Sequence, residues 1–279
     1  MSLIEKAGNV LRRRIHSAFH RREVPLGPIG PIVTFSFDDF PRSALTAGAE
    51  ILEGFGTRAT YYVTMSLMNT ENNLGVQFSQ QDLDSALDRG HELGSHTFSH
   101  LSARRVEYDA FERDVEKGEQ AIRKKMGLPG SGNFAYPCGD VTLESKRKLG
   151  PQFKSCRGTR GGLNGPNVDL NLLRGNSLYG DLDRLHNAKQ LILENERQAA
   201  WLIFYSHDVA LSPSPFGCTP KLLEAVCSFA AARNARFMTV AQVMKELKQQ
   251  REFLIRPELR IRNSSTSPAA ATDEHANKL

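Results

Sequence analysis

The chain has 279 residues, 40% of them hydrophobic, and a formal net charge of +5. This length exceeds that of a typical domain but suits a β/α barrel that folds as one unit, so one large domain is expected. The excess charge lies in the first 22 residues, which hold six lysines and arginines against Glu5 alone. The rest of the chain is neutral and lacks the broad basic surface that phosphate binding needs, which argues against a nucleic-acid partner.

The cysteine pattern and the first residues bear on the compartment. The four cysteines form no CxxC pair, and a core of this size needs no disulfides, so a reducing compartment is favoured. Residues 1–22 contain no continuous apolar run of the secretory type, and no run reaches transmembrane length, so we expect a cytoplasmic protein. We expect the basic arm to pack on its own domain or to fray; peripheral membrane contact as an amphipathic helix is the alternative.

Breaker residues and composition divide the chain into three parts. A linker rich in glycine and proline follows the arm, so we assign 1–30 to arm and linker and 31–250 to the folded domain. The segment 251–279 loses its apolar period and gains serine, threonine and alanine, which predicts a disordered tail.

Within the domain, short apolar runs alternate with helical patterns. Strands are expected at Ile32–Phe37, Ala59–Thr64, Glu92–Ser95, Asn133–Tyr136, Phe153–Cys156, Leu172–Arg174, Trp201–Tyr205 and Arg236–Thr239. Helices are expected from the capping pair Ser79 and Asp82 to Gly90, and over Val106–Met126 with Gly127 as the C-cap.

This alternation predicts an α/β fold with parallel strands, which either close into a barrel or form an open doubly wound sheet. The connection between the fifth and sixth expected strands is rich in glycine and reads as a loop instead of a helix. We therefore expect a distorted, TIM-barrel-like (β/α) barrel of seven or eight units.

Two acids and two histidines follow expected strands. Asp38 and Asp39 come directly after the apolar run IVTFSF, where a parallel strand delivers side chains to a site. A helix cap is the alternative reading for one aspartate, but two adjacent carboxylates favour a nearby cation. His96 and His100 follow the third strand at i, i+4 spacing, which brings both rings to one side of a turn. With an acid from another strand end, they predict a three-ligand open metal site.

The remaining histidines differ in their position along the strands. His207 follows the apolar run WLIFYS, at the end where barrel enzymes place catalytic groups, so we predict a catalytic role. His91 opens a strand, and we predict that it is structural.

Four segments, FSFDDF, HTFSH, NFAYPCGD and LIFYSHDV, resemble the successive motifs of the polysaccharide deacetylase family, also called the NodB homology domain or carbohydrate esterase family 4. The resemblance spans about residues 31 to 245. It implies a distorted barrel, with Asp38 as catalytic base and Asp39, His96 and His100 as ligands of one divalent ion. It also implies His207 as general acid and the backbone N–H of Cys138, after Pro137 and Tyr136, as an oxyanion donor.

The sequence departs from the family pattern at three positions. Phe40 stands where the family has glycine, which is expected to narrow the pocket beside the base. Ala135 stands where the third motif carries an arginine that orients the base; Arg157 or Arg160 could supply that charge, or could be loop or substrate-contacting residues. Tyr205 replaces a leucine before His207. An acid that would orient His207 is not evident, and Asp181, Asp183 and Asp208 are candidates.

These features predict a metal-dependent hydrolase that removes N-acetyl or other acyl groups from a carbohydrate, with an Asp base, a metal-bound water and a His acid. Zinc is the expected ion, with cobalt, nickel or manganese as alternatives. A carbohydrate O-acetyl esterase and a noncatalytic carbohydrate-binding barrel are the competing interpretations. The sugar, the acyl group and the oligomeric state are left open.

Overall fold

The computed structural model describes residues 15–16, 18–127 and 129–255. Its centre is a sheet of eight strands, with neighbours in the order β10-β11-β2-β3-β6-β7-β8 and with β12 beside β2. All of these pairs are parallel. The strands are β2 (Ile32–Asp39), β3 (Ala59–Val63), β6 (Glu92–Ser95), β7 (Asn133–Ala135), β8 (Ser155–Arg157), β10 (Asn176–Ser177), β11 (Trp201–Ser206) and β12 (Arg236–Phe237).

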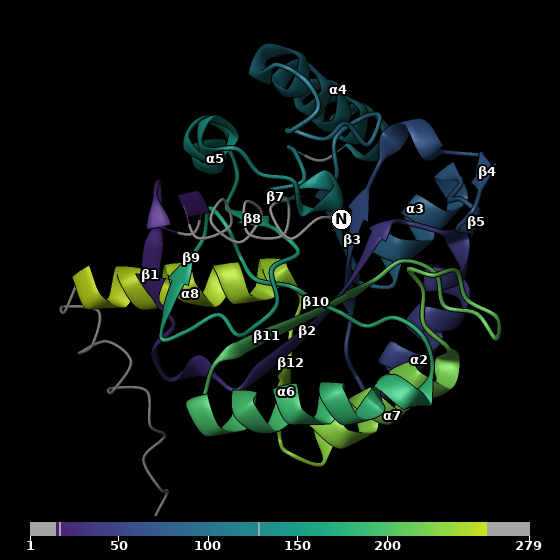
Figure 1. The fold of residues 1–279 in the computed structure, drawn as a ribbon, viewed down its shortest axis with the longest axis vertical. Helices are drawn as coiled ribbons and strands as arrows, with labels where there is room; N and C mark the ends of the chain where they lie inside the picture. The colour runs from purple at the N-terminus through teal and green to yellow at the C-terminus, as the bar shows by residue number, and fades with distance from the viewer. Residues whose placement is uncertain (1–14, 17, 128, 256–279) are drawn as a thin grey trace, which may run out of the picture.

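Helices surround this sheet (Figure 1). They are α2 (Ala49–Gly54), preceded by one π-helical segment at Ala44–Gly48, α3 (Gln80–Asp88), α4 (Tyr108–Met126), α5 (Leu143–Leu149), α6 (Leu185–Gln198), α7 (Pro220–Ala231) and α8 (Val240–Ile255). The expected distorted (β/α) barrel is therefore confirmed. Two short antiparallel pairs lie outside it: β1 (Glu23–Pro25) with β9 (Asn167–Asp169), and β4 (Glu71–Asn72) with β5 (Gly75–Val76).

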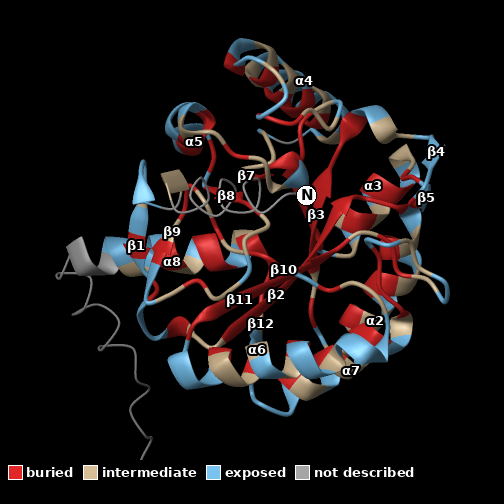
Figure 2. Cartoon of the chain, viewed as in Figure 1, coloured by how far each residue is buried: buried red, intermediate tan, exposed pale blue. Residues whose placement is uncertain are grey.

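Burial explains why the strands read as continuous apolar runs. Every residue of β2, β3, β6 and β11 is buried, because parallel strands in a barrel are covered by side chains on one face and by helices on the other. Figure 2 shows the same pattern, with buried strands at the centre and exposed residues on the outer faces of the helices.

Local signals place two of the helices as expected. The Ser79 side chain accepts from the Asp82 N–H and the Asp82 side chain accepts from the Ser79 N–H, which forms a capping box at the start of α3. Helix α4 is capped by Gly127, whose φ of 62° is the left-handed C-cap conformation that glycine adopts without steric cost.

The sixth strand is displaced from its expected position. Within the expected Leu172–Arg174, Leu173 forms an isolated bridge to Arg157, and the strand proper lies at Asn176–Ser177. The Leu173 N–H donates to the Cys156 carbonyl at 2.7 Å, and Ser177 pairs with Tyr205. This one segment therefore contacts β8 first and β11 next, and it closes the barrel with little regular pairing. The apolar pattern could not reveal such a change of partner.

The described part of the arm packs on the domain. The Arg22 guanidinium donates to the carbonyls of Phe153 (2.8 Å) and Lys154 (2.7 Å), and the Arg22 N–H donates to Asp169. The Lys146 ammonium, which is fully buried, donates to the His16 carbonyl at 2.8 Å and to Asp169 at 2.7 Å. Residues before the expected boundary at 30 thus contribute to the fold.

Two expectations fall largely outside the described residues. The amphipathic helix proposed for residues 1–22 depends mainly on residues 1–14, and most of the proposed disordered tail lies in 256–279. Residues 251–255 belong to α8. Among the residues that the structure describes, no helix combines the length and apolar character needed to cross a membrane.

Removal of residues 1–22 should lower the free energy of unfolding by about 1–3 kcal/mol, because the truncated protein loses the Arg22 bonds and leaves buried Lys146 with one partner fewer. Urea unfolding measures this change. A shorter truncation that begins at Ile15 keeps these contacts and serves as the control. Equal unfolding free energies for the two truncations would show that the contacts of His16 and Arg22 add nothing to stability.

Candidate active site

The predicted site residues meet at the carboxyl end of the barrel because their strands are in register. Asp39 pairs with Val63, and Val63 pairs with Ser95, so Thr64 and His96, which follow β3 and β6, lie one residue beyond the level of Asp39. On the other side of β2, Phe37 pairs with Ser206, which places His207 level with Asp38. Because parallel strands end at the same edge of the barrel, residues that are far apart in the sequence lie close together there.

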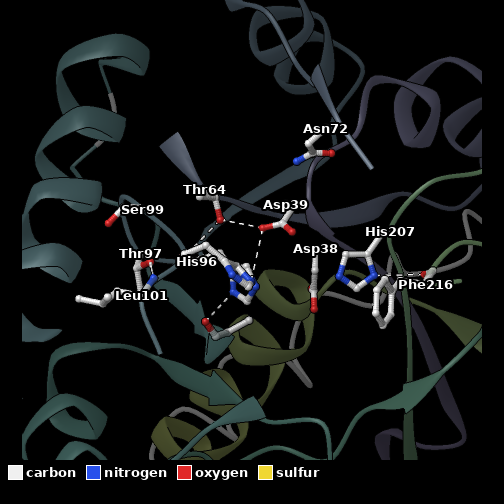
Figure 3. A network of polar contacts seen from close by, with 12 residues as sticks. Asp38, Asp39, Thr64, Asn72, His96, Thr97, Ser99, Leu101, His207 and Phe216 are labelled. Carbon is white, nitrogen blue, oxygen red and sulfur yellow. Dashed lines mark hydrogen bonds and ion pairs between the residues drawn. The ribbon is translucent and has the colours of Figure 1, made fainter. Parts of the chain in front are cut away.

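Asp39, His96 and His100 form a group that fits a metal ion. One possible ligand atom from each lies within 4.8 Å of the others. The Thr64 hydroxyl donates to Asp39 Oδ1 at 2.9 Å. His96 Nδ1 donates to the Ala135 carbonyl at 2.8 Å, which leaves Nε2 with a free lone pair (Figure 3). Such outer contacts commonly fix the orientation of metal-ligating side chains.

The protonation state of His96 also suits ligation. Burial is the main cause that lowers its pKa, to about 4, so the imidazole is neutral near pH 7. A neutral imidazole and a carboxylate are donors that first-row divalent ions accept. The residues present therefore fit the ion that the sequence predicts.

The loop that carries both histidines is held by α4. Asp114 accepts hydrogen bonds from the N–H groups of Phe98 (3.2 Å) and Ser99 (3.0 Å) and from the Ser99 hydroxyl (2.6 Å). Gly118 lies where the helix meets the loop: a Cβ there would stand 2.8 Å from the Thr97 carbonyl carbon. The absence of a side chain at Gly118 thus permits this close approach.

Unusual backbone conformations gather at the site. Five non-glycine residues here have positive φ: Asp39 (64°), Phe40 (70°), Thr97 (67°), His100 (57°) and Cys138 (56°). Each left-handed residue of this kind costs about 1–3 kcal/mol, and such strain concentrates at functional sites.

The effect expected of Phe40 was wrong. Its ring does not line the cavity beside the base; it is fully buried and stacks on Tyr61 and Phe78, with centroid distances of 4.3 and 5.3 Å. The left-handed turn at Asp39 and Phe40 directs the ring into the core. Glycine adopts such a turn most easily, so the departure at Phe40 affects backbone strain and core packing instead of pocket width.

Asp38 is buried and forms an ion pair with Arg157 at the end of β8. Burial alone would raise the pKa of the Asp38 carboxyl, but Arg157, His96 and His207 together lower it. Asp38 is therefore ionised near neutral pH. In the view of Figure 3, it lies between His96 on one side and His207 on the other.

His207 is oriented by a backbone carbonyl. Its Nδ1 lies 3.2 Å from the Phe216 carbonyl oxygen, to which it can donate. The three candidate acids bond elsewhere: Asp208 accepts from Ser214, Asp181 from Thr219, and Asp183 pairs with Arg184. A carbonyl acceptor on Nδ1 leaves Nε2 as the ring nitrogen available to a substrate.

These groups surround a cavity of about 560 Å³. Its lining includes Asp38, Asp39, His100, Cys138, Thr159, Tyr179, Tyr205, His207 and Phe216, together with Leu67 and residues 72–74 of the β4–β5 hairpin.

The four remaining sequence candidates, Tyr136, Pro137, Arg157 and Arg160, lie apart from this lining. Tyr136 is buried against Phe134 and Phe111, and Pro137 is also buried. Arg160 lines a separate cavity of about 410 Å³. Of the two arginines considered as the source of the charge beside the base, Arg157 is therefore the one that contacts Asp38.

Sequence reasoning missed Thr64, Tyr179 and Phe216. Thr64 directly follows β3, so the strand-end rule that identified Asp38 could have found it. Tyr179 follows the displaced strand β10, and Phe216 lies in the loop after β11, where no sequence pattern marks a site.

Substitution of Gly118 by Ala should lower the free energy of unfolding by about 1–3 kcal/mol, because the added methyl group overlaps the backbone of the histidine loop. Hydrogen exchange at the amides of Phe98 and Ser99 should also become faster. Gly54→Ala is the control: it lies at the end of α2 with nothing within 4 Å of the added carbon, and should be neutral or slightly stabilising. Unchanged exchange in Gly118→Ala would contradict this account of the helix contact.

Part of this chain is similar in sequence to known polysaccharide deacetylases. The family model described as polysaccharide deacetylase matches residues 28–152. The peptidoglycan-N-acetylglucosamine deacetylase PgdA of Listeria monocytogenes is 25% identical over 151 residues, which cover 54% of this chain. That match covers 30% of the length of PgdA, so the chain corresponds to only part of that relative.

Solved structures show the same fold. A family 4 acetyl xylan esterase from Clostridium thermocellum, in complex with a cobalt ion, matches with a TM-score of 0.52 and 19% identity over 77% of this chain and 90% of its own. The chitin deacetylase of the fungus Colletotrichum lindemuthianum matches with a TM-score of 0.52 and 16% identity over 77% and 87%. The chain is thus similar in sequence to the polysaccharide deacetylase family over residues 28–152, and it shares the fold of these two solved structures.

Proposed function

We propose that this protein is a metal-dependent deacetylase that hydrolyses the N-acetyl groups of a carbohydrate. The observation that carries the proposal is that one cavity is lined by the ionised Asp38, by His207 and by Asp39 and His100, which form a possible ligand group with the buried His96. The match of residues 28–152 to the polysaccharide deacetylase family model and the similarity to PgdA support it.

Asp39, His96 and His100 would hold one divalent ion, with zinc expected from two imidazoles and a carboxylate and with cobalt, nickel or manganese as alternatives. When bound, the ion supplies Lewis acidity, which polarises an acyl carbonyl and acidifies a neighbouring water molecule.

The residues of the chain then divide the proton transfers. Asp38 accepts a proton from the water that attacks the acyl carbon, and the backbone N–H of Cys138 donates a hydrogen bond to the oxygen that becomes negative. His207 gives a proton to the amide nitrogen as the carbon–nitrogen bond breaks, so the products are acetate and a free amine. The hydrogen bond to Phe216 keeps the His207 ring oriented during this transfer.

An O-acetyl esterase would use the same groups, since an alkoxide leaving group also accepts a proton, although it needs one less than an amine does. A noncatalytic carbohydrate-binding barrel is favoured less, because a binding site has no need of a buried, ionised Asp38 beside the ligand group. Acetate release from matched N-acetylated and O-acetylated oligosaccharides distinguishes the three. Turnover of the N-acetyl set is expected to be the faster, and release from neither set would contradict the proposal.

The purified protein should bind about one divalent ion per chain, and replacement of both His96 and His100 by Ala should abolish binding, because two of the three ligands are lost. Metal analysis after dialysis measures this directly. His91→Ala is a suitable control, since His91 bonds to the Ala59 N–H and to Glu53 at the opposite end of the barrel. A double variant that still binds stoichiometric metal with unchanged affinity would show that the site is elsewhere.

The adjacent acids should respond differently to the same change. Asp38→Asn cannot accept the proton of the water, so metal should stay bound while kcat falls by about 10²–10⁴-fold. Asp39→Asn should instead weaken metal affinity, and added metal should partly restore its activity. Acetate release measured across a metal titration separates the two patterns. Activity near that of the wild type in Asp38→Asn would refute Asp38 as the base.

A further inference from the structure

We propose that Arg157 is a positioning residue that holds the Asp38 carboxylate in place for catalysis. Arg157 lies on β8, beside Ala135 on β7. This inference rests on the proposed function, because it assigns Arg157 a part in the same reaction. Three observations support it: the register of β7 and β8, the contacts of the Arg157 guanidinium, and the close packing of Gly175 against the buried Arg157 side chain.

The register places Arg157 beside Ala135. These two residues are Cα partners on the neighbouring parallel strands β7 and β8, so they lie at the same level of the barrel. The side chain at position 135 is a single methyl group, and its backbone carbonyl orients His96. Ala135 cannot supply a positive charge beside Asp38. The long side chain of Arg157, one strand away, supplies that charge instead.

The contacts of Arg157 fix the direction of its guanidinium. One nitrogen, Nη2, donates to Asp38 Oδ1, and Nη1 donates to the Gly158 carbonyl at 3.2 Å. Aromatic rings contact it as well: the guanidinium carbon lies 5.0 Å from the ring centroid of Tyr62 and 4.8 Å from that of Tyr205. The flat guanidinium stacks on aromatic rings in a way that a lysine ammonium cannot, so the contacts select arginine.

Tyr205 has a second place in this arrangement, because it also lines the reaction cavity. Tyr205 therefore contacts both the guanidinium and the space that a substrate would enter. Arg157 is fully buried and is absent from the cavity lining, so it reaches the reaction only through Asp38. That placement identifies a positioning role and argues against direct contact with the substrate.

Gly175 packs closely against the buried Arg157. A Cβ at this position would lie 3.2 Å from Arg157 Cδ, 3.1 Å from Tyr205 Cδ1 and 3.1 Å from the Gly158 carbonyl oxygen. The segment that closes the barrel thus packs closely against Arg157 and Tyr205, and a side chain at 175 would require these neighbours to shift by a few tenths of an ångström.

Arg157→Ala should bind metal like the wild type and keep its KM, while kcat falls by about 10²-fold because Asp38 is no longer held in the attacking geometry. Guanidinium ion at millimolar concentration, far below denaturing levels, should restore part of kcat by entering the space left by the side chain. A role confined to stability predicts no such rescue. Arg160→Ala, whose side chain lines the separate cavity, should leave kcat unchanged.

Wild-type acetate release tests the proposed function itself, so failure of the two ideas can be told apart. If Arg157→Ala does not fold, Arg157→Gln keeps much of the volume between the rings without the charge and decides the same question. In a folded, metal-loaded variant, kcat within about threefold of the wild type, or a loss that guanidinium does not relieve, would overturn the positioning role. Recovery of kcat in Ala135→Arg/Arg157→Ala would give further support, because the register brings position 135 to the same level.

Discussion

The burial of two adjacent carboxylates is the constraint on which this site depends. Asp38 and Asp39 are both nearly inaccessible to water at the end of β2. An ionised carboxylate taken out of water costs several kcal/mol unless positive charge or hydrogen bonds replace its solvation. Arg157 supplies that charge to Asp38, and Thr64 supplies a hydrogen bond to Asp39. The proposed metal ion would balance the remaining negative charge of Asp39. Each of the two acids would then interact with a different cation.

This division explains how two identical side chains can take different roles. The guanidinium contacts Asp38 on the side of β8, whereas the imidazoles of His96 and His100 surround Asp39 on the side of β6. The left-handed turn at Asp39 separates the directions of the two carboxylates. Strain in that turn, like that at His100, is maintained by the buried strands and by α4, which packs against the histidine loop.

The sequence predicted the parts of the site that depend on long apolar strands. Asp38, Asp39, His96 and His207 were found because each follows a continuous buried run, and parallel strands end at a common rim. The position of Phe40 was misread because the side-chain direction depends on a positive φ, which no periodicity shows. The sequence could not show whether Arg157 or Arg160 contacts Asp38. It also could not show where β10 lies. Both depend on how an irregular segment closes the barrel, which is a long-range property.

That closing segment links the distortion of the barrel to the chemistry proposed for it. In a regular barrel, one strand over residues 170–177 would bond to both β8 and β11 along its whole length. Here the segment contacts β8 near Leu173 and β11 near Ser177. The change of partner occurs around Gly175, the residue that lies against Arg157. Because it covers the guanidinium, the segment excludes water and lowers the local dielectric, which strengthens the attraction between Arg157 and Asp38. The least regular part of the barrel is therefore the part that sets the environment of the proposed base.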